Sequence, residues 1–172
     1  HNISDGVKIF MGEIDITAQL ATNDDDVEET KDNGNMDLTS SDLELCIEEW
    51  VWPIPDEDQW VALRYSDLNI PQSASISNAY IQFTSNENQS NPAAIAVYGE
   101  NIDDASTFTG SNYNVSFRSR TSATVNWIPS SWITDASGAT EQTPDITSIV
   151  QEIVNRPGWQ SGNAMAFIFD GS

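Results

Sequence analysis

The chain has 172 residues, with 27 acidic side chains against 6 basic ones, and its formal net charge is −21. Six Trp, six Phe and four Tyr supply a hydrophobic core for one domain of this length and argue against a disordered chain. The charge repels phosphate backbones and anionic lipid headgroups, and no apolar run approaches the ~20 residues of a membrane span. Nucleic-acid binding and membrane insertion are therefore not expected.

The N-terminal segment alternates apolar and polar residues, which is typical of a β-strand with one buried face. The phase of the alternation changes at Gly12, and this predicts a bulge or a kink between two strand segments. An amphipathic strand of this kind pairs either with its own domain or with the sheet of the next copy, as a donor strand. We assign residues 1–21 to this extension and 22–172 to the main domain. The apolar positions, candidates for self-assembly, are Val7, Ile9, Met11, Ile14, Ile16, Ala18 and Leu20.

An acidic tract follows: fourteen of the 27 acidic residues, and a single base, Lys31, lie between Asp24 and Asp58. Calcium prefers six to eight oxygen ligands, which clustered carboxylates can supply. The alternative is a solvated run of charge. The candidate ligands are Asp24, Asp25, Asp26, Glu28, Glu29, Asp42 and Glu44.

Two tryptophans at the end of this tract, Trp50 and Trp52, share one face of an expected strand beside a Pro-rich acidic loop. Aromatic side chains with one polar group are suited to stacking on sugar rings, so both residues are candidates for carbohydrate binding. We expect Trp60, Trp127 and Trp159 to lie in the core instead.

Short alternating runs continue through the rest of the chain and predict an all-β fold, an antiparallel β-sandwich of jelly-roll type. They fall at residues 43–47, 60–65, 76–84, 93–98, 123–127 and 164–169. One segment has helical spacing instead, and we predict a single α-helix over residues 144–155 near the C-terminus. Thr143 and Asp145 are its candidate N-caps, and Gln151 and Glu152 are expected to face water.

Three segments resemble a repeat module of large secreted and surface proteins of marine and freshwater microbes. They are LTSSDLELC (38–46), VALRYSDLNIPQSASISNAYIQFTSNE (61–87) and TPDITSIVQEIVNRPGWQSGNAMAFIF (143–169). The last also resembles the ending of DNRLRE-type domains, which are jelly rolls of the carbohydrate-binding kind. The resemblance covers residues 22 to 170; it implies the fold and an extracellular location, and it carries no catalytic residues.

No catalytic motif is present, and the single histidine, His1, excludes a Ser–His or Cys–His pair within the fold. We expect the four arginines to pair with some of the surplus acids. Three N-glycosylation sequons begin at Asn2, Asn88 and Asn114 and favour a secreted protein weakly.

The sequence thus predicts a non-catalytic extracellular building block, structural or adhesive, that binds copies of itself. It would form filaments by donor-strand pairing, with cations stabilising its acidic loops. The alternative is a calcium-dependent carbohydrate-binding module whose partners are glycans.

Overall fold

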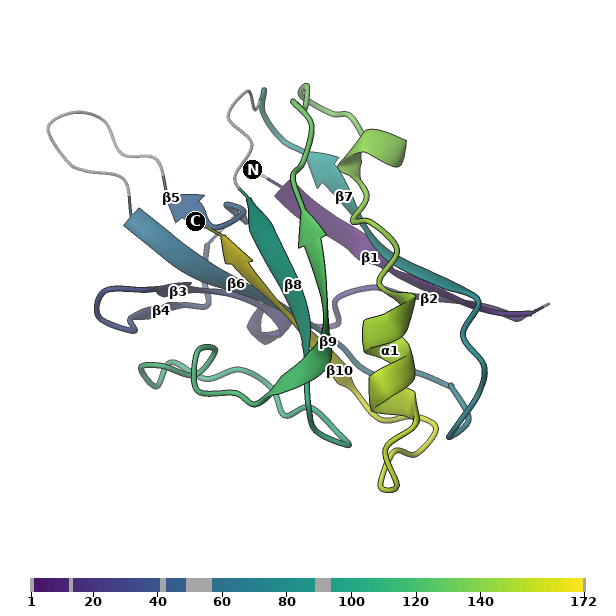
Figure 1. Cartoon of the computed structure of the whole chain (residues 1–172). Helices are drawn as coiled ribbons and strands as arrows, with labels where there is room; N and C mark the ends of the chain where they lie inside the picture. Colours follow the sequence, from purple (N-terminus) through teal and green to yellow (C-terminus); the bar gives the residue numbers. More distant parts are fainter. Residues whose placement is uncertain (1, 13, 41–42, 49–56, 89–93, 172) are drawn as a thin grey trace, which may run out of the picture.

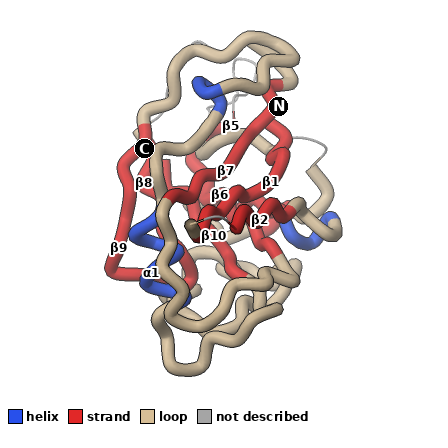
Figure 2. The backbone as a smooth tube through the Cα atoms, turned by 90° about the vertical axis from the view of Figure 1, so that its right-hand side faces the viewer, coloured by secondary structure: helices blue, strands red, loops and turns tan. Residues whose placement is uncertain are grey.

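The computed structural model describes residues 2–12, 14–40, 43–48, 57–88 and 94–171. They form two antiparallel sheets packed face to face, with one short helix beside them (Figure 1). The smaller sheet has the order β2-β1-β7, in which β1 is Asn2–Met11, β2 is Ile14–Ala18 and β7 is Asn78–Ser85. Figure 2 shows these three strands side by side. The predicted all-β sandwich with a single helix near the C-terminus is confirmed.

The larger sheet has seven strands in the order β4-β3-β6-β10-β8-β9, and β5 pairs with β6 outside this path. Two 3₁₀ turns, η1 at Asn23–Asp25 and η2 at Ala139–Glu141, lie in the connections. The strands are β3 (Asp26–Thr30), β4 (Met36–Asp37), β5 (Ile47–Glu48), β6 (Glu57–Tyr65), β8 (Ile95–Glu100), β9 (Arg120–Trp127) and β10 (Met165–Gly171).

The main core lies between the two sheets, because alternate residues of each strand point inward. Val61 and Leu63 of β6 and Phe169 of β10 are fully buried there together with Val7 of β1. Phe83 of β7 lies among aromatic rings, about 6 Å from the centroids of Trp127, Trp132 and Phe169. Trp127 and Trp159 are buried in this core, as predicted.

The N-terminal segment is a β-hairpin, so the prediction of a bulge or kink at Gly12 is wrong. Met11 pairs with Ile14, which leaves a two-residue turn between β1 and β2. Gly12 takes a left-handed φ of 63°, the conformation such a turn requires. The change of phase in the sequence therefore marks a reversal of the chain. β1 becomes the middle strand of the small sheet, and its bulge falls between Ser4 and Gly6.

The helix α1 spans Thr147–Val154 and is shorter at its N-terminus than predicted. The preceding backbone covers the edge of β7 instead: Thr143 N–H donates to the Ile81 carbonyl, and Ile146 N–H donates to the Ala79 carbonyl. The predicted apolar stripe is buried, with Ile149, Val150, Ile153 and Val154 in the main core.

A second, smaller core covers the outer face of the larger sheet, which we define as the face turned away from the small sheet. Ala62 and Ile168 of this face pack against Phe108 and Val115, which belong to the connection between β8 and β9. That connection, residues 101–119, crosses the lower part of the outer face (Figure 1). Among the described residues, no helix has the length and apolar character needed to cross a membrane.

Candidate functional site

The first part of the acidic tract contains a strand that the sequence did not suggest. Asp26–Thr30 is β3, and neighbouring residues of a strand point to opposite faces. The Glu29 side chain is 1 % exposed, and its Oε2 accepts hydrogen bonds from the backbone N–H of Val115 (2.7 Å) and of Ser116 (3.0 Å) on the outer face. Glu28 is also buried, and its Oε1 accepts from the Glu44 N–H at 2.7 Å. These carboxylates hold loops in place.

The other predicted calcium ligands are similarly dispersed. Asp25 is buried and forms an ion pair with Arg64, with Oδ1 and Nη1 2.6 Å apart. Burial is the main cause of the raised pKa of Asp26, and the nearby Asp25 charge adds to it. Within the described ranges, no three His, Cys, Asp or Glu side chains form a group that could hold a metal ion. Asp42 lies outside the described residues, and calcium binding stays a prediction.

Away from this connection, the outer face carries a row of side chains from four neighbouring strands. Trp60 of β6 is opposite Asp170 of β10, Asp170 is opposite Ala96 of β8, and Ala96 is opposite Asn126 of β9. Tyr98 lies one row further along β8 on the same face, opposite Thr124. Strands are spaced about 4.8 Å apart, so the row from Trp60 to Asn126 is about 14 Å long.

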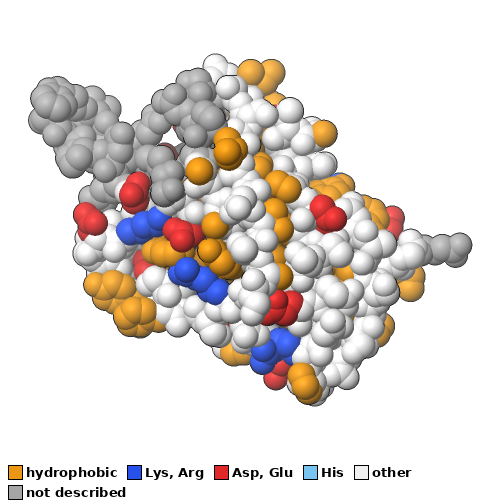
Figure 3. Space-filling view, in the orientation of Figure 1, with side chains coloured by type: hydrophobic (Ala, Val, Ile, Leu, Met, Phe, Trp, Pro, Cys, Tyr) orange, Lys and Arg blue, Asp and Glu red, His pale blue; other side chains and the backbone are white. Residues whose placement is uncertain are grey.

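Two basic side chains flank Trp60, which is half-buried. The Arg120 Cζ atom is 4.1 Å from the centroid of the Trp60 ring and 5.2 Å from that of Tyr98. The Lys31 Nζ atom is 4.9 Å from the Trp60 centroid and donates to Asp170 Oδ1 at 2.8 Å. In Figure 3 two basic groups flank hydrophobic side chains on this face, with an acidic group between them. Two of the six basic residues of the chain thus gather around one aromatic ring.

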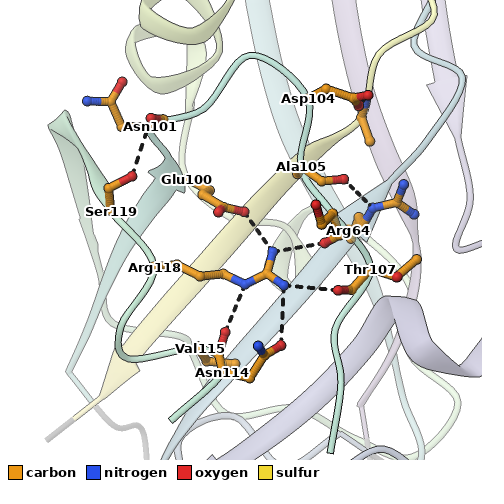
Figure 4. A network of polar contacts seen from close by, with 12 residues as sticks. Arg64, Glu100, Asn101, Asp104, Ala105, Thr107, Asn114, Val115, Arg118 and Ser119 are labelled. Atoms are coloured by element: carbon orange, nitrogen blue, oxygen red, sulfur yellow. Dashed lines mark hydrogen bonds and ion pairs between the residues drawn. The ribbon is translucent and has the colours of Figure 1, made fainter. Parts of the chain in front are cut away.

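Arg118 and Arg120 are two positions apart but differ in their bonding. The Arg118 guanidinium donates five hydrogen bonds, to Glu100, to Asn114 twice, and to the carbonyls of Ser106 and Thr107 (Figure 4). No hydrogen bond or ion pair joins the Arg120 guanidinium to any other described residue. Arg120 was expected to pair with an acid, as Arg64, Arg118 and Arg156 do. Its guanidinium instead lies against the Trp60 and Tyr98 rings.

An open groove of about 410 Å³ lies over the part of this row from Asp170 to Asn126 and extends from there to Ala94 and Ile128. Backbone and side chains of β8, β9 and β10 form its walls, and its polar side chains are Asn126 and Asp170. The lining residues are Ala94, Ile95, Ala96, Asn126, Trp127, Ile128 and Asp170. Asp170 therefore belongs both to the groove and to the Lys31–Trp60 contact. We call Trp60, Tyr98, Arg120, Asp170 and Asn126 the outer-face site.

Trp60 was expected in the core, and the structure corrects that expectation. In β6 the residues Val61, Leu63 and Tyr65 point into the main core and are fully buried. Trp60 and Arg64 occupy the alternate positions and therefore point to the outer face. The alternation in the sequence contained this signal, because a core tryptophan would have to share the phase of its apolar neighbours. Tyr98 and Arg120 were missed because only the sheet brings their strands to Trp60.

The remaining predicted site residues are distributed as follows. Trp50 and Trp52, the predicted carbohydrate ligands, lie outside the described residues. Of the sequon asparagines, Asn2 is part of β1, Asn88 is exposed, and Asn114 is half-buried with its Oδ1 accepting from the Thr109 N–H. Use of these sequons stays a prediction.

The predicted self-assembly residues all belong to the β1–β2 hairpin or directly follow it. Val7 and Ile9 are fully buried in the main core, whereas Ile14 is 62 % exposed. Met11, Ile16, Ala18 and Leu20 are partly buried against that core.

Comparison with known proteins gives no match to a family model, to a curated protein or to a solved structure. The resemblance to secreted repeat modules stays a prediction.

Proposed function

We propose that the protein is a non-catalytic, extracellular carbohydrate-binding domain whose glycan site is the outer-face site. The observation that supports this most directly is the Arg120 guanidinium, which lies against the Trp60 and Tyr98 rings without a carboxylate partner among the described residues. The chain has a net charge of −21, so carboxylates are abundant, and a guanidinium that none of the described ones binds keeps its donors for a ligand.

The chemistry of the outer-face site suits a sugar chain. The Arg120 guanidinium lies over the Trp60 ring, so a pyranose would meet its N–H donors there rather than the indole face. The half-buried Tyr98 ring beside it offers apolar surface to the C–H groups of the sugar. Asn126 adds an amide that donates and accepts, and Asp170 adds an acceptor. The row of about 14 Å and the groove that extends from it provide room for more than one sugar unit. Because the strands are already paired, the site is preorganised.

A glycan array followed by titration calorimetry with the best glycan tests this proposal. We expect Trp60→Ala and Arg120→Gln each to weaken binding about tenfold or more. Phe117→Ala is the matched control, because Phe117 is an aromatic residue 80 % exposed on the 101–119 connection and outside the site. Absence of any bound glycan, or unchanged affinity in both site variants, would overturn the proposal.

A second candidate function is the self-assembling building block, which one observation favours. The β1–β2 hairpin supplies Val7 and Ile9 to the main core, and the residues that follow it, Gln19, Ala21 and Thr22, are exposed. The same hairpin inserted into a neighbouring copy would make the same contacts there, and a chain of such exchanges gives an open filament. Deleting residues 1–20 and adding them back as a peptide tests this candidate. Under exchange, the truncated chain stops polymerising and the peptide restores its stability; a full-length chain that never polymerises contradicts it.

A further inference from the structure

The small sheet has two edges, and one of them is closed by the chain itself. The outer edge of β7 is bonded to the segment that precedes α1, through Thr143 and Ile146 and through the Asp145 Oδ1, which accepts from the Ala79 N–H. Gln82 also forms a bridge with Gln142. In the larger sheet, the edge of β9 is capped similarly: Glu152 Oε1 and Oε2 accept from the N–H groups of Ser122 and Ala123 at 2.8 and 2.7 Å.

The outer edge of β2 has no such cover, since no hydrogen bond from another described element reaches Ile14–Ala18 on that side. An uncovered strand edge is a template for pairing with another chain. Ile14 adds an apolar side chain, 62 % exposed, to the same edge strand. The edges of β7 and β9 are closed, and the remaining edge strands β4 and β5 have only two residues each, so β2 is the longest described strand with an uncovered edge.

The geometry of the hairpin determines which backbone groups are open. A two-residue turn makes Met11–Ile14 a hydrogen-bonded pair, and hydrogen-bonded pairs alternate with non-bonded ones along an antiparallel ladder. Ile14, Ile16 and Ala18 therefore direct their N–H and C=O groups toward β1. Asp15 and Thr17 direct theirs away from the sheet.

We propose that β2 pairs antiparallel with β2 of a second copy, about a two-fold axis through Ile16, which joins the two small sheets into one six-stranded sheet. In this register Asp15 is opposite Thr17 of the second copy, and the two pairs related by the axis exchange four backbone hydrogen bonds. Every outward backbone group of Asp15 and Thr17 is used. Ile14 lies opposite Ala18 of the second copy and is covered by it.

Charge and the length of β2 favour this register over the two in which the axis passes through an adjacent residue. An axis through Asp15 would place two carboxylates directly opposite each other, and like charges at that distance destabilise a pair. An axis through Thr17 would leave the outward groups of Asp15 opposite Gln19, beyond the end of the strand. With the axis at Ile16, each Asp15 carboxylate is opposite a Thr17 hydroxyl. The interface is short, and two chains of charge −21 repel, so we expect a weak dimer that salt strengthens.

Sedimentation equilibrium of the full chain at rising protein concentration, at low and high sodium chloride, tests the proposal. We expect the fraction of dimer to increase with the protein concentration and with the sodium chloride concentration. Thr17→Pro removes an outward N–H while leaving the ladder with β1 intact, because Pro is tolerated on an edge strand. It should raise the dimer Kd at least tenfold with the circular dichroism spectrum unchanged.

A second pair of variants does not involve the backbone. Ile14→Asn should also weaken the dimer, whereas Ile133→Asn should not, although Ile133 is equally exposed at 68 % and lies outside the hairpin. A chain that is monomeric at every concentration overturns the proposal, as does a dimer that Thr17→Pro and Ile14→Asn leave unchanged. Open-ended polymers would overturn the closed dimer and favour hairpin exchange instead.

Discussion

The Tyr113 ring lies directly over the Cα of Gly34, so that a β-carbon at position 34 would overlap the Cδ1 and Cε1 atoms of the ring. The Tyr113 N–H also donates to the Gly34 carbonyl at 2.9 Å. Gly34 belongs to the β3–β4 turn and Tyr113 to the 101–119 connection, so this contact joins two distant parts of the chain. Tyr113 stacks in turn on Phe117, with ring centroids 5.0 Å apart.

Gly34→Ala should therefore destabilise the fold for two reasons: its φ of 71° is left-handed, and its methyl group meets the ring. We expect a loss of about 1–3 kcal/mol in the free energy of unfolding, measured with urea. Gly12→Ala is the matched control, because Gly12 has a similar φ of 63° and no atom near the new methyl group. Equal losses in both variants would mean that the Tyr113 contact is irrelevant.

The Arg118–Glu100 ion pair should be important for stability, because both side chains are about 10 % exposed or less and Nη1 and Oε2 are 2.7 Å apart. Arg118→Ala leaves Glu100 buried without its cation, and we expect a loss of about 3–5 kcal/mol. Arg118→Lys should recover only part of this loss, because an ammonium group cannot reach all the acceptors of a planar guanidinium. Thermal unfolding checks the expected order of stability, in which the native chain is the most stable and Arg118→Ala the least. A lysine variant as stable as the native chain would contradict it.

Asp145 should make stability depend on pH at the acidic end. Burial opposes its ionised form, but the hydrogen bonds from the Thr147 hydroxyl and from the N–H groups of Thr147 and Ala79 outweigh it and lower the Asp145 pKa below 3.8. Its contribution is fully present above the unfolded pKa and is lost as the pH falls through the lower folded value. Urea unfolding between pH 7 and pH 2 should show a shallower acidic decline for Asp145→Asn than for the native chain.

Asp26 serves as an internal comparison, because folding shifts its pKa in the opposite direction to that of Asp145. The pKa of Asp26 is raised, mainly by burial, so folding disfavours the ionised form of this carboxyl group. Asp26→Asn should therefore be more stable than the native chain at pH 7, with the difference vanishing below pH 3.8. A destabilised Asp26→Asn variant at pH 7 would contradict the assignment.

Calcium binding by the acidic tract makes a separate prediction. If the tract binds calcium in the folded state alone, millimolar calcium should raise the melting temperature above its value in chelator. Asp24→Asn should reduce this shift, because the Asp24 side chain is exposed and available to a cation. Magnesium at the same concentration controls for general screening of charge. A melting temperature that calcium leaves unchanged would remove the proposal.

The alternation of apolar residues was sufficient to predict most strands and the sandwich, because each strand has one face in the core. It failed at β3, where we interpreted Asp26, Glu28 and Glu29 as calcium ligands or as a solvated run of charge. Two of these three are buried by contacts with Glu44, Val115 and Ser116, which lie far away in the sequence. The local pattern of apolar and polar residues cannot predict hydrogen bonds to such distant residues.

The start of the helix was mispredicted for the same reason. Residues 143–146 have good local signals for a helix N-terminus, but the N–H groups of Thr143 and Ile146 donate to carbonyls of β7 instead. Gln151 and Glu152 were expected to face water, yet Gln151 accepts from the Ile76 N–H and Glu152 caps β9. Only part of the outer-face site could be predicted from the sequence. Trp60, Tyr98 and Arg120 come together only because β6, β8 and β9 belong to one sheet.

The position of β10 has a consequence for how the chain folds as it is synthesised. β10 lies between β6 and β8 and is the only strand that joins them in the described part of the larger sheet. Until Met165–Gly171 has left the ribosome, β6 and β8 each have an unsatisfied edge and the sheet is in two halves. Such contacts between distant segments form slowly and leave strand edges open in the meantime. The nascent chain therefore completes its larger sheet only after almost all of the described residues have emerged.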